Sequence, residues 1–153
     1  MLVVIAEKEE LKLVEELGYG DEPIIITGVG GLNVIRALKD FPRDTEILNI
    51  GYAGSNVLPV GTRVYVDQVH TYHEVAGFKE PNLFANGIYK IGYKCHDCYT
   101  STDFVIKTDI DTPCVFDMEL AFIRALFDNV RSIKVVSDNL NKEEYKKEIK
   151  KND

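Results

Sequence analysis

The sequence predicts an α/β protein with a three-layer α/β/α fold and a mostly parallel central sheet. Short uninterrupted apolar runs, which are typical of strands buried on both faces, alternate with segments whose apolar residues recur at helical spacing. Glycine-containing turns follow several of these runs. A length of 153 residues is close to the commonest domain size, so we expect residues 1–153 to form a single domain.

The first half of the chain contains three predicted strands and two predicted helices. The runs at 2–5, 24–27 and 46–50 are too short for helices and rich in Val, Ile and Leu, so we interpret them as buried strands. Apolar residues at roughly helical spacing predict a helix over 9–17, and glycines end it. A glycine turn after the second strand leads into a second helix that includes 34–38.

The second half is predicted to add four strands and one helix. The predicted strands are 62–69, 88–93, 114–116 and 132–136. Polar and apolar residues alternate along 62–69, which predicts a strand with one solvated face. The Gly, Pro and Asn residues of 75–87 predict a loop, and 118–127 has the apolar spacing of a helix. The Lys- and Glu-rich segment 141–153 is at best a solvated helix with a frayed end.

Charge and composition exclude several classes of function. The net charge is −7, and the sequence has no basic stripe, so a nucleic-acid partner is not expected. No segment is apolar and long enough to span a membrane and no signal peptide is evident, so we expect a cytoplasmic protein. Cys95 and Cys98 have the spacing of half a zinc site, but a second ligand pair is missing. We therefore expect no metal and no organic cofactor.

The turns that follow the predicted strands are where a ligand site is expected. In open α/β sheets the ligand crevice lies beyond the carboxyl ends of the strands. Those turns are 7–10, 28–33, 51–55 and 137–139. Gly28-Val29-Gly30-Gly31 matches a dinucleotide-binding turn only in part, because Asn33 stands where the third glycine is required. Close packing of a helix against the sheet explains these glycines as well.

Seven short motifs, in order along nearly the whole chain, carry a family resemblance. They are Ala6-Glu7-Lys8-Glu9-Glu10, Thr27-Gly28-Val29-Gly30-Gly31-Leu32-Asn33, Asn49-Ile50-Gly51-Tyr52-Ala53-Gly54, Val60-Gly61-Thr62-Arg63-Val64, Ser101-Thr102-Asp103-Phe104-Val105, Asp117-Met118-Glu119 and Val136-Ser137-Asp138. Together they resemble the 5'-methylthioadenosine/S-adenosylhomocysteine nucleosidases of the nucleoside phosphorylase superfamily. The resemblance implies hydrolysis of the N-glycosidic bond of a purine nucleoside.

The resemblance also implies roles for individual residues. Glu10 would activate the attacking water and Asp138 would protonate the leaving purine at N7. Met118 and Glu119 would hold the ribose, and Phe104 would stack on the base. The full set of substrate-binding residues that it implies is Tyr52, Ala53, Gly54, Phe104, Val105, Met118, Glu119, Ser137 and Phe78. Phe78 would be donated across a homodimer, with Phe84 as a further contact.

Two carboxyl groups suit this chemistry on general grounds. Glycoside cleavage passes through an oxocarbenium-like state. Enzymes usually place a carboxylate base on one side of it and a carboxylic acid on the other. Structural explanations stay open at this point. Glu10 lies in the first turn of a predicted helix, where the dipole alone favours an acidic residue, and Asp138 could be a simple cap. Phe104 could belong to the core, whereas Glu119 in an apolar segment must be paired or functional.

The sequence favours water over phosphate as the nucleophile. Phosphate dianions require backbone amides and arginine side chains, whereas the segment 6–10 is full of carboxylates. Tyr52 is larger than the small residue usual in the resembled family, and the final helix that normally shields the site is abbreviated. A phosphate-dependent phosphorylase and a catalytically inactive nucleoside-binding protein of the same fold therefore remain as alternatives.

Overall fold

The computed structural model describes residues 1–73, 77–81 and 94–150. The predicted strand at 88–93 and the proposed dimer contact Phe84 lie outside these ranges. Eight strands and five helical segments are present within them.

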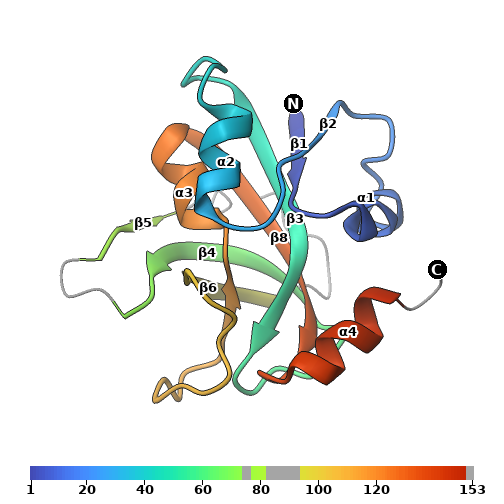
Figure 1. Ribbon diagram of the computed structural model, residues 1–153, viewed down its shortest axis with the longest axis vertical. Coiled ribbons are helices and arrows are strands. Elements are labelled where there is room, and N and C mark those ends of the chain that lie inside the picture. Colours follow the sequence, from blue (N-terminus) through green and yellow to red (C-terminus); the bar gives the residue numbers. More distant parts are fainter. Residues whose placement is uncertain (74–76, 82–93, 151–153) are drawn as a thin grey trace.

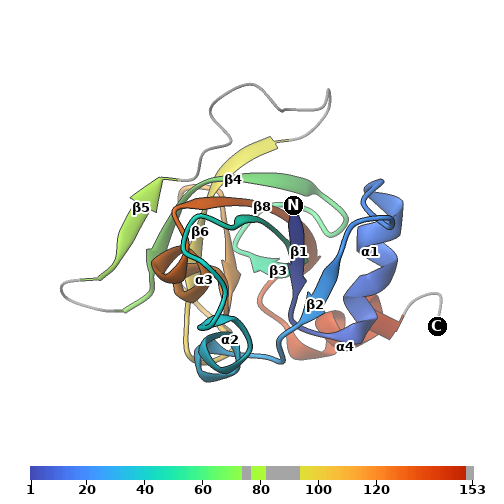
Figure 2. The same cartoon turned by 90° about the horizontal axis from the view of Figure 1, so that it is seen from above.

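Five strands of the mixed sheet pair in a closed, barrel-like ring (Figures 1 and 2). β3 (Glu46–Ser55) lies parallel to β8 (Asn129–Asp138) and antiparallel to β7 (Cys114–Asp117). β6 (Lys94–Thr100) lies parallel to both β7 and β4 (Arg63–Thr71). The antiparallel pairing of β4 with β8 completes the ring.

Three further strands extend this ring. β1 (Leu2–Ile5) pairs in parallel with β3, and β2 (Ile24–Ile26) pairs in parallel with β1 at the outer edge. β5 (Lys79–Pro81) is antiparallel to β4. The sheet therefore contains five parallel and three antiparallel pairings among the described strands.

The helical segments surround the sheet. They are η1 (Lys8–Glu10), α1 (Leu11–Glu16), α2 (Gly31–Leu38), α3 (Leu120–Leu126) and α4 (Lys142–Lys150). α2 and α3 pack against each other, whereas α1 and α4 lie on another side of the molecule (Figure 1). Within the described ranges no helix is long and apolar enough to cross a membrane.

The α/β class is confirmed and most pairings are parallel, but the sheet is mixed and closes into a barrel-like ring, so the predicted three-layer arrangement differs from the structure. β3 and β8 each contain ten residues, which is long enough to form pairs along both edges. The register between them shifts between Ala53 and Gly54, and such an irregularity bends a strand. Beyond it, Gly54 and Ser55 pair with β7, so the sheet curves and closes instead of lying flat between two helical layers.

Three local predictions also differ from the structure. The strand at 24–27 is not buried, because it lies at the sheet edge, where the side chain of Ile26 is 47% exposed. Part of the predicted loop 75–87 pairs with β4 as β5. The turn predicted at 51–55 is the second half of β3.

The alternation of side chains along the strands fills two apolar clusters. Val4 contributes to the cluster that also holds α2 and α3 side chains, whereas Val3 and Ile5 contribute to the cluster that contacts α1. Gly31 opens α2 beside α3, and a Cβ atom there would lie 2.5 Å from the ring of Phe122. The predicted packing role of this glycine is therefore correct, although its neighbour is a helix and not the sheet.

Candidate functional site

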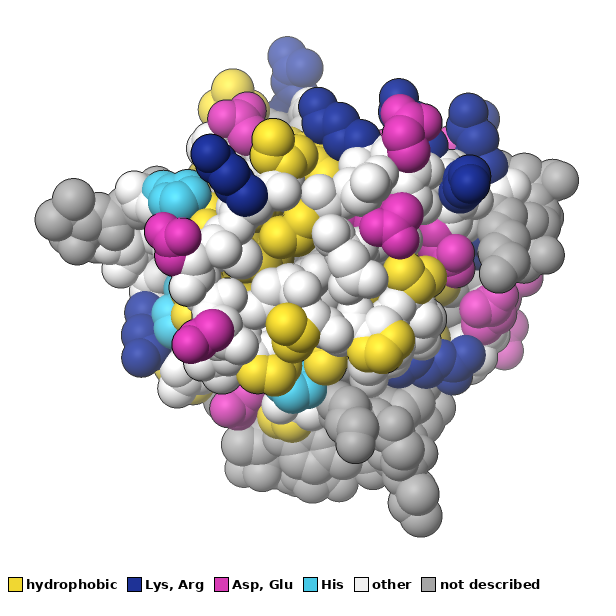
Figure 3. Space-filling model, turned by 90° about the horizontal axis from the view of Figure 1, so that it is seen from below, with side chains coloured by type: hydrophobic (Ala, Val, Ile, Leu, Met, Phe, Trp, Pro, Cys, Tyr) yellow, Lys and Arg dark blue, Asp and Glu magenta, His cyan; other side chains and the backbone are white. Residues whose placement is uncertain are grey.

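A pocket of about 200 Å³ lies where β1, β3, β7 and β8 end. β3 and β8 run down to this side of the molecule in Figure 1, next to α4. On the face seen from below in Figure 3, Lys and Arg side chains are interspersed with Asp and Glu. Over the described residues drawn there, this face has no basic stripe of the kind that a nucleic-acid backbone requires.

Glu10 lies at one side of the pocket and is held by three backbone N–H groups. Ala6 and Glu7 donate to its Oε1 at 2.9 and 3.1 Å, and Tyr52 donates to its Oε2 at 2.8 Å. Only 5% of Glu10 is exposed. A Cβ atom at Gly51 would lie 2.7 Å from Oε2, so glycine at this position lets the carboxyl lie directly against β3.

The environment of Glu10 suits a general base. Burial raises its pKa above the ordinary value, while the charge of Lys134 and the three N–H donors oppose this shift. The same donors hold the carboxyl in one orientation. Glu10 is therefore a fixed carboxylate whose basicity exceeds that of an exposed glutamate.

Glu119 lies just before α3 and faces the same pocket. The N–H of Gly30 donates to its Oε2 at 2.8 Å, so the glycine turn after β2 supports this carboxyl group. Gly30 has φ = 90°, a left-handed conformation that favours glycine. Burial, together with the nearby charge of Asp117, raises the pKa of Glu119 to about 8.

The raised pKa of Glu119 predicts a pH-dependent stability. In the folded protein Glu119 keeps its proton up to about pH 8, whereas in the unfolded chain it loses the proton near 4.5. The native state then binds more protons in this window, so its stability must fall as pH rises. Relative to Glu119→Gln, the unfolding free energy of the wild type should fall by up to about 1.4 kcal/mol per pH unit. Urea unfolding between pH 5 and 8 measures this slope. Equal pH dependence of the unfolding free energy in the wild type and Glu119→Gln would contradict the prediction.

Asp117 of the pocket wall forms a buried ion pair with Lys134, which was not predicted from the sequence. Lys134 Nζ lies 3.1 Å from Asp117 Oδ2, and both side chains are 1% exposed. Burial alone would raise the pKa of Asp117, but Lys134 and the Thr100 hydroxyl outweigh it and lower that pKa. A lysine inside the apolar run 132–136 was the available signal, because a buried charge requires a partner.

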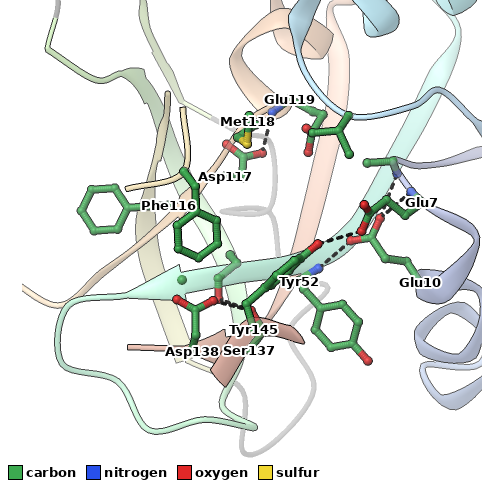
Figure 4. A pocket seen from close by; sticks show the side chains of 15 residues that line it. Glu7, Glu10, Tyr52, Phe116, Asp117, Met118, Glu119, Ser137, Asp138 and Tyr145 are labelled. Atoms are coloured by element: carbon green, nitrogen blue, oxygen red, sulfur yellow. Dashed lines mark hydrogen bonds between the residues drawn. The ribbon is translucent and has the colours of Figure 1, made fainter. Parts of the chain in front are cut away.

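Asp138 ends β8 on the side of the pocket opposite Glu10 (Figure 4). The Ser137 hydroxyl donates to its Oδ2 at 2.7 Å, and the Leu140 N–H donates to its Oδ1 at 2.8 Å. Burial raises the pKa of Asp138, although these hydrogen bonds oppose the shift. A Cβ atom at Gly54 would lie 3.0 Å from Oδ1, so this glycine also admits a carboxyl against β3.

The structure brings most of the residues predicted for the site to one pocket. Its wall includes Glu10, Tyr52, Ala53, Gly54, Phe104, Met118, Glu119, Ser137 and Asp138. Val105 lines a smaller adjoining recess that shares Phe104 and Asp138 with the main pocket. Phe78 packs against the core and is not part of this wall.

The ring of Tyr52 does not narrow the pocket in the way its size suggested. Tyr52 follows Leu48 and Ile50 in the alternation of β3, and its ring packs on the apolar cluster beside α1. Figure 4 shows the ring directed away from the carboxyl of Glu10, which only the backbone N–H of Tyr52 contacts. A larger side chain is therefore compatible with this position.

The segment predicted to be at best a solvated helix forms α4, which has no buried residue but contributes one side chain to the pocket. Tyr145 from α4 lines the pocket, and its hydroxyl donates to Glu7 Oε2 at 2.7 Å. Its ring meets Phe104 edge to face, with centroids 5.6 Å apart. At the other end of the helix, Lys12 Nζ donates to the carbonyl of Ile149 at 2.7 Å. The short final helix thus contributes Tyr145 to the pocket wall.

The cysteines form no cluster suited to a metal. Cys95 is exposed in β6, whereas Cys98 and Cys114 are buried in separate strands. Among the described residues no group of three His, Cys, Asp or Glu is arranged to hold a metal ion.

Comparisons with known proteins identify the fold. No protein-family model and no curated protein sequence matches the chain. The 5'-methylthioadenosine/S-adenosylhomocysteine nucleosidase of Helicobacter pylori superposes with a TM-score of 0.77 at 15% identity, over 98% of this chain and 90% of that chain. The Neisseria meningitidis enzyme of the same name gives 0.74 at 16% identity, over 97% and 90%. Futalosine hydrolase of Helicobacter pylori gives 0.73 at 14% identity, over 98% and 90%. The chain therefore has the fold that these nucleoside hydrolases share.

Proposed function

We propose that this protein hydrolyses the N-glycosidic bond of a purine nucleoside, with Glu10 as general base and Asp138 as general acid. One observation carries the proposal: Glu10, Glu119 and Asp138 come from distant parts of the chain and line the same pocket. A nucleoside with its base at Asp138 and its ribose beside Glu119 brings the anomeric carbon between the two catalytic carboxyls.

The proposed reaction balances with these groups alone. The bond between the anomeric carbon and the purine nitrogen breaks as Asp138 donates its proton to the purine. Water adds its oxygen to the resulting oxocarbenium-like carbon, and Glu10 accepts the proton that water releases. The raised pKa of Asp138 supports the acid role, because a buried carboxyl retains a proton more readily at neutral pH.

Water is a better nucleophile than phosphate for this pocket. Five of its fifteen lining residues carry carboxyl groups, namely Glu7, Glu10, Asp117, Glu119 and Asp138. Neither Lys nor Arg occurs among the described residues of that wall. Even with Glu119 and Asp138 protonated, a phosphate dianion would meet the carboxylates of Glu10 and Asp117 there without a guanidinium or ammonium partner. This charge distribution supports a hydrolase over a phosphorylase.

Two features support a hydrolase over an inactive binding protein. The ring of Tyr52 packs on the apolar cluster beside α1, and Tyr145 adds a side chain from the short final helix to the pocket wall. The similar Neisseria enzyme was solved in complex with methylthio-immucillin-A, so methylthioadenosine belongs in the first assay. The cytoplasmic location and the homodimer remain predictions.

Release of free base by the purified protein tests the proposal. Methylthioadenosine, adenosine and inosine are incubated with the wild type, each with and without phosphate, and the products are separated by chromatography. We expect free base and free sugar from at least one nucleoside at a rate that phosphate does not raise. Turnover that requires phosphate and yields a sugar phosphate would overturn the hydrolase assignment.

A further inference from the structure

Glu7 and Tyr145 form a polar pair in the pocket that the proposed reaction does not use. Glu7 is the second residue after the end of β1, and Tyr145 lies 138 positions later on α4. Their 2.7 Å hydrogen bond joins the two ends of the described chain across the pocket wall. A pair assembled from such distant segments, with both members lining a cavity, is placed to contact a ligand.

The position of this pair relates it to one part of a nucleoside. In Figure 4, Asp138 and Ser137 lie on one side of the pocket, whereas Glu7 lies on the other side beside Glu10. A nucleoside extends from its base through the ribose to the 5' substituent. With the base at Asp138 and the ribose beside Glu119, the 5' substituent is directed to the side of Glu7.

The chemistry of this side favours a hydrogen-bond donor. A carboxylate only accepts hydrogen bonds, and it attracts cations. Burial and the hydrogen bond to Glu7 raise the pKa of Tyr145, so its hydroxyl stays neutral and remains a donor to Glu7. Glu10 adds a second carboxyl nearby. An alkylthio group would cover these polar atoms without giving them a hydrogen bond, and a 5'-phosphate would be repelled.

We infer that the Glu7 and Tyr145 pair selects purine nucleosides whose 5' substituent is a hydrogen-bond donor, with a protonated amine preferred to a hydroxyl and a hydroxyl preferred to an alkylthio group. This inference rests on the proposed function for the orientation of the nucleoside. Glu7 and Tyr145 are specificity-determining residues in it and take no part in proton transfer.

A set of three nucleosides that differ only at the 5' position tests the inference. The kcat/KM values of 5'-amino-5'-deoxyadenosine, adenosine and methylthioadenosine are compared for the wild type, Glu7→Gln and Tyr145→Phe. We expect the wild type to prefer the amine to the methylthio compound at least tenfold. Loss of the charge in Glu7→Gln should reduce that preference by about tenfold to a hundredfold, the usual contribution of a charged hydrogen bond. Tyr145→Phe keeps the ring against Phe104. It should change the ratio of kcat/KM for the amine to kcat/KM for the methylthio compound without abolishing turnover.

Binding measurements separate this inference from the proposed function. The dissociation constants of the same three compounds are measured by calorimetry, and Glu9→Gln, outside the pocket wall, is the matched control for Glu7→Gln. Turnover of all three compounds at equal efficiency, unchanged in Glu7→Gln, overturns the inference and leaves the hydrolase intact. Tighter binding of the amine without any base release supports the inference and overturns the hydrolase. Absence of binding by all three overturns both.

Discussion

Replacing Asp138 with asparagine is expected to lower kcat for purine nucleosides by about 10²–10⁴-fold, the usual contribution of a positioned general acid. Asparagine has nearly the same shape, and its Oδ1 still accepts the N–H groups of Leu140 and Asn141 that start the connection to α4. Its amide has no acidic proton to transfer to the purine. The fold should therefore persist while the chemical step slows, which circular dichroism and single-turnover kinetics measure separately.

The leaving group provides the control for this substitution. The nitrophenolate of a nitrophenyl riboside leaves as a stable anion without protonation, so Asp138→Asn should cleave this substrate within about tenfold of the wild-type rate. Asp44→Asn, on the exposed surface, should leave both substrates unaffected. Equal loss on the two substrates would mean that Asp138 only shapes the pocket. Unchanged turnover of the nucleoside would remove it from the mechanism.

The strands with uninterrupted apolar runs could be predicted from the sequence. β1 and β7 are such runs, because both of their faces are buried. The centre of β8 is also buried on both faces, but Lys134 interrupts its apolar residues. β6 was missed, since Lys-Cys-His-Asp-Cys-Tyr-Thr contains no apolar run. Its polar side chains are satisfied instead by partners such as His70, whose Nε2 lies 2.9 Å from Asp97 Oδ2.

Closure of the sheet could not be predicted, because it depends on pairings between distant segments. The antiparallel contacts of β3 with β7 and of β4 with β8 join residues about 60 to 70 positions apart. Local periodicity reports which side chains are buried, but it carries no information on which edge a strand pairs with. The resemblance supplied the family of folds, whereas composition alone supplied only the α/β class.

The candidate site, too, could be predicted only in part from the sequence. Glu10, Glu119 and Asp138 were predicted through short motifs at the ends of strands, and they share a pocket. The contact of Tyr145 with Glu7 had no local signal, because α4 has the charged composition of a solvated helix. Gly51 and Gly54 were predicted to lie in a turn at the site. They do lie at the site, but on a continuous strand, where both make room for carboxyl groups.

Replacing Lys134 with methionine is expected to lower the unfolding free energy by about 3–5 kcal/mol, the usual effect of removing one partner of a buried ion pair. Methionine fills much of the same volume, but it leaves Asp117 charged and buried beside Glu119 and Glu10. Urea unfolding at pH 7 measures the loss. Lys146→Met removes an exposed lysine that lies 3.9 Å from Glu143, and it should change stability by less than about 0.5 kcal/mol.

A second substitution distinguishes the ion pair from a simple packing effect. The double variant Lys134→Met/Asp117→Asn no longer contains the uncompensated charge, and the amide oxygen can still accept the Leu120 N–H. It should therefore regain part of the unfolding free energy that Lys134→Met loses. Lys134 also opposes the rise in the pKa of Glu10, so in any Lys134→Met protein that folds, the acidic limb of the kcat/KM profile should move to higher pH. Two results would contradict this account: Lys134→Met loses no more stability than Lys146→Met, or the double variant is no more stable than Lys134→Met alone. Either result would show that the charge of Lys134 does not stabilise the buried carboxyl groups of the site.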